Sequence, residues 1–173
     1  GRNEKDITDC FSKGWINVTG TNNVNIGGFL GENLGTTISS YGIGDVSITN
    51  NGDYRTSNVG GFAGSSQGPD IAKCYSKGDV SVTSSAYYSY SIFENFGGFL
   101  GLKAKGNITD CFSIGDTAVS VWSSYASLSD IGGFTGHNDG NLENSYSTGS
   151  ASGSGAGGAT DVGGFCGENT DTI

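Results

Sequence analysis

The chain has 173 residues with 32 glycines, a share of about 18% against the usual ~7%, and only 34% of its residues are hydrophobic. No apolar run reaches the ~20 residues that a membrane-spanning helix needs, and the glycines follow no Gly-X-Y period, which excludes such a helix and a collagen triple helix. The formal net charge is −9, from 17 acidic and 8 basic residues. A surface of this charge repels phosphate groups, so we expect neither nucleic acid nor a membrane surface as a partner, and the missing apolar run predicts no membrane insertion.

The glycines mark an internal repeat. In chain order, Gly-Gly-Phe triplets begin at Gly27, Gly60, Gly97, Gly132 and Gly163. Their spacings are 33, 37, 35 and 31 residues, with a mean of 34. A second motif alternates with the triplets and reads I-T-D-C-F-S-K-G from Ile7, S-S-Y-G-I-G-D-V from Ser39, A-K-C-Y-S-K-G-D-V from Ala72, I-T-D-C-F-S-I-G-D from Ile108 and L-E-N-S-Y-S-T-G from Leu142. Five copies with the same landmarks are typical of a repeat architecture.

The second motif has the period of a β-strand. Over residues 74–83, the small or apolar set Cys74, Ser76, Gly78, Val80 and Val82 alternates with a largely polar set. Residues 40–49 split in the same way, and no stretch has helical periodicity. We therefore predict an all-β fold, a parallel β-helix (β-solenoid) of about five rungs, one per ~34-residue repeat, with two or three strands per rung. Residues 1–173 would form this single repeat domain.

The two motifs together resemble the GLUG motif repeat. The pattern appears as G-G-F-L-G-E-N-L-G from Gly27, G-G-F-T-G-H-N-D-G from Gly132 and G-G-F-C-G-E-N from Gly163, and the copies at Gly60 and Gly97 depart at the Asn position. The resemblance implies a β-solenoid within large secreted or surface-anchored bacterial proteins, such as adhesins and the accessory regions of immunoglobulin A proteases. It implies no catalytic residues. We therefore expect an excerpt of a larger surface protein, located outside the cell or on the bacterial cell surface.

Two aromatic columns follow from stacking the copies in register. We expect the first to be a core stack of Phe29, Phe62, Phe99, Phe134 and Phe165. The second consists of Phe11, Tyr41, Tyr75, Phe112 and Tyr146. It alternates with a small column, Cys10, Ser40, Cys74, Cys111 and Ser145, so the two columns face opposite sides of the strand. We expect the second aromatic column to pack under a loop or against another part of the rung; the alternative is an outward ladder that stacks sugars.

The segments before each Gly-Gly-Phe vary most and contain aromatic residues. Because aromatic faces bind the apolar faces of sugars, a recognition site is one interpretation of these segments; extra strand that covers the solenoid is the favoured one. The candidate ligand-binding residues are Tyr54, Tyr87, Tyr88, Tyr90, Trp122 and Tyr125. Phe93 belongs to the same segments.

Asp45, Asp79 and Asp116 occupy one repeat position in successive copies. Carboxylates stacked ~4.8 Å apart repel one another unless they are solvated, protonated or bridged by a cation. A Ca²⁺ ion is a candidate ligand for this column, although no D-x-D-x-D-G loop occurs, and solvated turn aspartates are the favoured interpretation. No other cofactor is expected.

The remaining reactive residues offer little chemistry. The chain has four cysteines, Cys10, Cys74, Cys111 and Cys166. Serines at equivalent positions of the small column predict that its cysteines are small buried fillers; a Cys74–Cys111 disulfide stays open, and the absence of C-x-x-C gives no support to zinc. His137 is the only histidine, and its repeat neighbours Glu32 and Glu168 predict an exposed turn. We therefore expect no enzyme.

Three functions remain. The favoured one is a non-catalytic stalk and adhesive surface that meets a host or cell-surface glycan or protein. The alternative is a dedicated glycan-binding module, and the weakest is a polysaccharide-active enzyme that uses the aspartate column. Exposed end rungs would also permit end-to-end self-association.

Overall fold

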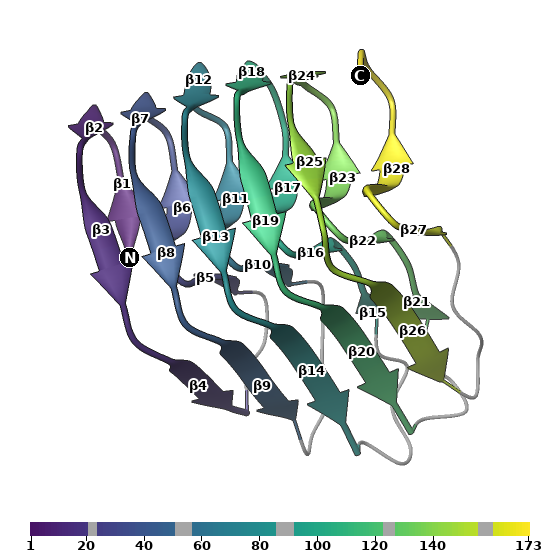
Figure 1. The fold of residues 1–173 in the computed structure, drawn as a ribbon. Helices are drawn as coiled ribbons and strands as arrows, with labels where there is room; N and C mark the ends of the chain where they lie inside the picture. Colours follow the sequence, from purple (N-terminus) through teal and green to yellow (C-terminus); the bar gives the residue numbers. More distant parts are fainter. Residues whose placement is uncertain (21–23, 51–56, 86–91, 123–126, 156–160) are drawn as a thin grey trace.

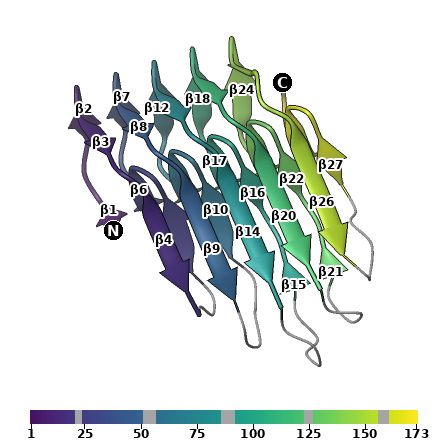
Figure 2. The same ribbon diagram turned by 60° about the horizontal axis from the view of Figure 1, so that its bottom comes forward.

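The computed structural model describes residues 1–20, 24–50, 57–85, 92–122, 127–155 and 161–173. These residues form a parallel β-solenoid without any helix, in which the chain winds along one axis and each copy of the repeat stacks on the previous one (Figures 1 and 2). The predicted fold class and the ~34-residue rung are confirmed. Among the described residues, no helix has the length and apolar character needed to cross a bilayer.

Four five-stranded sheets and one six-stranded sheet run along the solenoid in the described part of the chain. The six-stranded sheet follows the Gly-Gly-Phe motif: β1 (Arg2–Asn3), β6 (Leu30–Asn33), β11 (Ala63–Ser66), β17 (Leu100–Lys103), β23 (Thr135–Asn138) and β28 (Cys166–Asn169). The sheet before it contains β5 (Asn25–Gly27), β10 (Asn58–Gly60), β16 (Phe96–Gly97), β22 (Ile131–Gly132) and β27 (Val162–Gly163).

The second motif supplies the other three long sheets. The first contains β2 (Ile7–Thr8), β7 (Thr37–Ile38), β12 (Asp70–Ala72), β18 (Asn107–Thr109) and β24 (Asn141–Glu143). The next, which we call the aromatic sheet, contains β3 (Phe11–Lys13), β8 (Tyr41–Ile43), β13 (Tyr75–Lys77), β19 (Phe112–Ile114) and β25 (Tyr146–Ser147). The last contains β4 (Ile16–Thr19), β9 (Val46–Asn50), β14 (Val80–Ser84), β20 (Thr117–Val121) and β26 (Ala151–Gly155). A short pair, β15 (Ile92–Phe93) and β21 (Ser127–Leu128), lies beside them.

Each copy therefore makes five short strands where the sequence predicted two or three. Two corners divide the second motif. Before the aromatic sheet, the residue at each corner adopts a left-handed conformation, with φ of 51–55° at Asp9, Ser39, Lys73, Asp110 and Asn144. After it, glycine makes the corner, and Gly78 has a φ of +140° that a residue with a side chain rarely adopts. The periodicity of the sequence did not show these bends, because a bend of this kind leaves the alternation intact.

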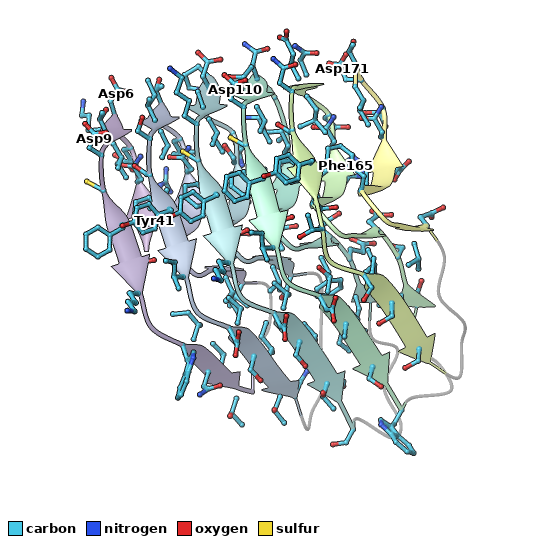
Figure 3. All side chains as sticks on the ribbon, viewed as in Figure 1. Asp6, Asp9, Tyr41, Asp110, Phe165 and Asp171 are labelled. Atoms are coloured by element: carbon cyan, nitrogen blue, oxygen red, sulfur yellow. The ribbon has the colours of Figure 1, made fainter. Side chains whose placement is uncertain are left out.

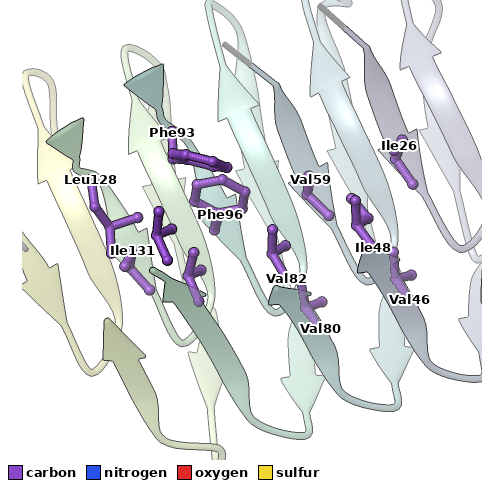
Figure 4. Packing of buried hydrophobic residues seen from close by; sticks show 12 residues of the cluster. Ile26, Val46, Ile48, Val59, Val80, Val82, Phe93, Phe96, Leu128 and Ile131 are labelled. Carbon is purple, nitrogen blue, oxygen red and sulfur yellow. The ribbon is translucent and has the colours of Figure 1, made fainter. Parts of the chain in front are cut away.

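The interior follows the predicted alternation. Cys74, Ser76, Val80 and Val82 are buried, and the apolar side chains pack into two clusters along the axis. One cluster fills the space between the sheet of β14 and the sheet of β10, and includes Val82 and Val59 (Figure 4). The other holds the predicted phenylalanine stack, whose neighbouring ring centroids lie 4.8–5.0 Å apart. The core-stack prediction is confirmed.

The Asn of the G-G-F-x-G-x-N-x-G pattern closes a turn. The buried Asn33 and Asn138 side-chain amides donate to the carbonyls of Gly35 and Gly140, at 2.8 and 2.5 Å. In the copies that lack this Asn, Ser66 and Lys103 take the position. The Lys103 ammonium group is buried and donates to the Gly68 carbonyl at 3.1 Å, so a longer side chain fills the same structural position.

Candidate functional site

An unbroken ladder of aromatic rings runs along the aromatic sheet. Phe11, Tyr41, Tyr75, Phe112 and Tyr146 are in register from rung to rung, and neighbouring centroids lie 4.7–5.3 Å apart with planes within 11° of parallel. Tyr41 is part of a row of ring side chains that crosses the front of the molecule in Figure 3. Stacked pairs of this kind add about 0.5–1.5 kcal/mol each beyond the area that they bury.

The ladder lies at the surface. Phe11 and Tyr146, at its two ends, are 64% and 52% exposed, and the three rings between them are half-buried because each is flanked by its neighbours. The expectation that a loop or another part of the rung would cover this column is therefore wrong. The outward direction of the alternative is correct, and its sugar stacking stays a prediction.

The next outward position of the same strands borders the ladder. It holds the exposed ends of Lys13, Lys77 and Ile114, so the stripe beside the rings is apolar and cationic rather than acidic. In a chain with a net charge of −9, ring surfaces and ammonium groups lie together on this face. Burial and the neighbouring Tyr41 raise the pKa of the Tyr75 hydroxyl, so Tyr75 is a neutral hydrogen-bonding group at neutral pH.

Of the six candidate residues in the variable segments, the structure places one. Trp122 directly follows β20 and is 74% exposed. Tyr54, Tyr87, Tyr88, Tyr90 and Tyr125 lie outside the described residues. Phe93 belongs to the same segments but is fully buried in the core, as the covering-strand interpretation expects for it. Sequence reasoning did not single out Trp15, which is 78% exposed at the corner between β3 and β4.

The aspartate carboxylates of the candidate Ca²⁺ column accept hydrogen bonds from backbone N–H groups. One oxygen of Asp45 accepts the N–H of Asp79 at 3.0 Å, and one oxygen of Asp79 accepts the N–H of Asp116 at 2.9 Å. Asp116 in turn accepts the N–H and hydroxyl of Ser150, at 2.8 and 2.9 Å, and these bonds lower its pKa. The carboxylates thus link successive rungs at a solvated corner, which agrees with the favoured interpretation. Ca²⁺ binding to this column stays a prediction.

All four cysteines are free thiols. Cys74 and Cys111 are buried on adjacent rungs, and the Cys74 N–H donates to the Cys111 sulfur at 3.4 Å, as expected for small fillers. Cys10, in the first copy of its motif, is exposed, so the filler prediction fails there; Cys166, which lies outside that column, is half-buried. His137 is also placed differently: it lies within β23 and is half-buried rather than in an exposed turn.

The comparisons with known proteins concern the repeat. The family model described as the GLUG motif matches residues 56–82 and 127–152. These two segments are GLUG motifs. Each match spans the triplet, the turn after it and the strand motif that ends in the sheet of β14, so the family unit corresponds to one rung of the solenoid. No curated protein and no solved structure matches the chain.

Proposed function

We propose that this chain is a non-catalytic GLUG-repeat segment of a secreted or cell-surface bacterial protein, a stalk whose outward aromatic ladder is an adhesive surface. The observation that carries the proposal is the ladder itself. Five stacked rings on one rigid sheet form a contiguous apolar stripe, and such stripes on soluble proteins mark interaction sites. Rings held by their neighbours lose little conformational freedom when a partner binds.

The scaffold supports the stalk part of the proposal. Parallel strands pair in register along the whole axis, and the core clusters are continuous from rung to rung. A repeat of this kind extends by stacking identical units, since each rung contacts only its neighbours. The partner is a glycan or a protein at a host or cell surface: ring faces pack on apolar sugar faces or apolar side chains, and the flanking Lys13 and Lys77 add hydrogen-bond donors.

A second candidate, a dedicated glycan-binding module, is favoured by one observation. Trp122 is 74% exposed at the start of a variable segment, and a single exposed indole is well suited to stack on a sugar ring. This candidate places binding at the end of β20, on a different sheet from the ladder.

Binding of the purified chain to a printed array of glycans and extracellular-matrix proteins tests both. Tyr75→Ser with Phe112→Ser interrupts the ladder, Trp122→Ala removes the indole, and Ser81→Ala alters an exposed control residue. Circular dichroism first confirms that each variant is folded. Loss of binding in the ladder variant alone supports the adhesive ladder, and loss in Trp122→Ala alone supports the glycan module. Wild-type protein that binds nothing on the array contradicts both.

A further inference from the structure

The only histidine of the chain lies in a cluster of acidic groups. His137 of β23, Asp130 immediately before β22 and Glu168 of β28 place one ring nitrogen and two carboxylate oxygens within 4.8 Å of one another. Two features of the fold bring them together. Parallel pairing of β23 with β28 sets His137 beside Glu168, and the reversal at Gly133–Phe134 returns the chain so that Asp130 faces His137.

The distances from the ring nitrogen to the two carboxylates fit those between ligands of one metal ion. His137 Nδ1 lies 3.1 Å from Glu168 Oε2 and 3.4 Å from Asp130 Oδ2. Hydrogen bonds from a charged N–H donor to a carboxylate are shorter, about 2.7–2.9 Å. Ligands that bind one ion at about 2.0–2.1 Å in tetrahedral geometry lie about 3.3–3.4 Å from one another, and slightly closer in octahedral geometry.

The other ring nitrogen already has a partner. His137 Nε2 lies 2.9 Å from Asp139 Oδ1, and that carboxylate also accepts the hydroxyl of Thr170. With a proton on Nε2, assigned from this network, the Nδ1 lone pair faces two carboxylates, whose charge is balanced by a second ring proton or by a metal ion. A histidine that ligates a metal ion through one nitrogen usually donates its other N–H to a carboxylate or a carbonyl, which fixes the orientation of the ring.

The repeat gives independent support. At the position of Asp130, the earlier copies have Asn25, Asn58 and Asn95, whose amides form a hydrogen-bonded ladder at 2.7 Å per step. The ladder changes from amide to carboxylate at Asp130, in the same copy in which His137 stands where the previous copy has Leu102.

We infer that Asp130, His137 and Glu168 form a binding site for one divalent transition-metal ion of the Zn²⁺ type. The imidazole nitrogen favours such an ion over Ca²⁺ or Mg²⁺, which prefer all-oxygen sites. Two ligands come from one rung and the third from the next, so the ion links β23 to β28 and fixes the stacking of that rung. The site is independent of the aromatic ladder and of the proposed adhesive function.

Titration of tag-free, reduced protein with ZnCl₂ by isothermal calorimetry tests the site. The expected result is one Zn²⁺ per chain, with affinity reduced at least tenfold in His137→Gln and in Glu168→Gln. Glu32→Gln is the matched control, because Glu32 occupies the same repeat position on another rung. This substitution removes the same charge as Glu168→Gln, but at a site away from the cluster. It should leave affinity within about twofold.

Nuclear magnetic resonance of the single imidazole in wild-type protein gives a second test, which needs no variant and so holds even if a variant fails to fold. In wild-type protein, ZnCl₂ should shift the Nδ1 resonance of His137, and equal concentrations of MgCl₂ or CaCl₂ should not. Unshifted ring resonances at saturating Zn²⁺ would overturn the inference. So would equal affinity of the wild type and His137→Gln, which would show that Zn²⁺ binds the acidic surface in general.

Discussion

The hydroxyl of Ser76 donates a hydrogen bond of 2.7 Å to the carbonyl oxygen of Gly98, 22 residues further along the chain. Ser113 makes the same bond to Gly133 at 2.8 Å, and the corresponding serines of the first and last copies bond to Gly28 and Gly164. Each bond joins the serine of the strand motif to the second glycine of a Gly-Gly-Phe triplet across the interior. One motif therefore supplies the donor of this hydrogen bond and the other supplies its acceptor.

Removing this donor should destabilise the solenoid. Ser76→Ala leaves the buried Gly98 carbonyl without its side-chain partner, so we expect the free energy of unfolding to fall by about 1–2 kcal/mol. Ser81→Ala, at an exposed position of the neighbouring strand β14, is the control and should change it by less than about 0.5 kcal/mol. Chemical denaturation measures both, and equal values for the two variants would contradict this account of the motif.

The second copy lacks this serine, and a substitution should restore the missing hydrogen bond. Gly42 takes its place, and a Cβ built there would lie 3.2 Å from the Gly61 carbonyl oxygen, close enough for a serine hydroxyl to reach it. Gly42→Ser should therefore raise the free energy of unfolding by about 0.5–1.5 kcal/mol. Gly42→Ala, which restores the β-carbon without the hydroxyl, should gain less. If Gly42→Ser is no more stable than Gly42→Ala, the new hydroxyl does not form the predicted hydrogen bond.

The second glycine of the triplet is required where another rung stacks on it. A Cβ at Gly98 would lie 2.3 Å from the Gly133 carbonyl oxygen, whereas a Cβ at Gly164 meets nothing within 4 Å. Gly98→Ala should thus lower the free energy of unfolding by several kcal/mol, since backbone must move to admit the methyl group. Gly164→Ala, at the same repeat position, should stay within about 1 kcal/mol of wild type. Thermal unfolding monitored by circular dichroism distinguishes them, and a tolerated Gly98→Ala would contradict the stacking.

Lys103 should make the stability depend on alkaline pH. Burial lowers its pKa from the usual 10.5 to about 8. Between these two values the unfolded chain binds a proton that the folded chain does not, so stability rises with pH across this window. The increase should approach about 3 kcal/mol. Denaturation of wild type and Lys103→Met at pH 7.5 and 10.5 isolates this residue from the titrating tyrosines and cysteines. A Lys103→Met protein with the same pH-dependent increase as wild type would contradict the prediction.

His137 should titrate above its usual range when metal is absent. Burial lowers its pKa, but the hydrogen bond to Asp139 and the charges of Asp139, Asp130 and Glu168 together raise it; Asp161 also lies near enough to raise the pKa of Asp130. Because the folded pKa is raised, the stabilisation is complete below the unfolded value of 6.5 and is lost as pH rises through the folded pKa. In EDTA, the ring resonances should give a lower pKa in Asp139→Asn than in wild type. An unchanged pKa would show that Asp139 does not hold the ring.

The fold could be predicted from sequence because its signal is repeated. The alternation from Cys74 to Val82 appears in more than one copy, and identical landmarks stack only if the strands are parallel and in register. The outward direction of Tyr75 follows from the same alternation. Whether anything covers Tyr75 does not, because that depends on segments whose sequences differ between copies.

Aligning the copies of the repeat predicts only part of the histidine cluster. Stacking the copies aligns His137 with Glu168, and the sequence shows this pairing. Asp130 is seven residues from His137 and reaches it only because the chain reverses at Gly133–Phe134. The residues of this reversal, 131–136, are all buried and show no period-2 alternation, so the third donor could be found only in three dimensions.

The proposed adhesive ladder is tested most directly by hydroxyl-radical footprinting of the wild-type chain, free and bound to the array component that retains it. The account predicts that binding lowers the labelling of Phe11, Tyr41, Tyr75, Phe112 and Tyr146, and leaves Trp122 labelled as in the free protein. Ladder residues that are labelled equally in both states would contradict it.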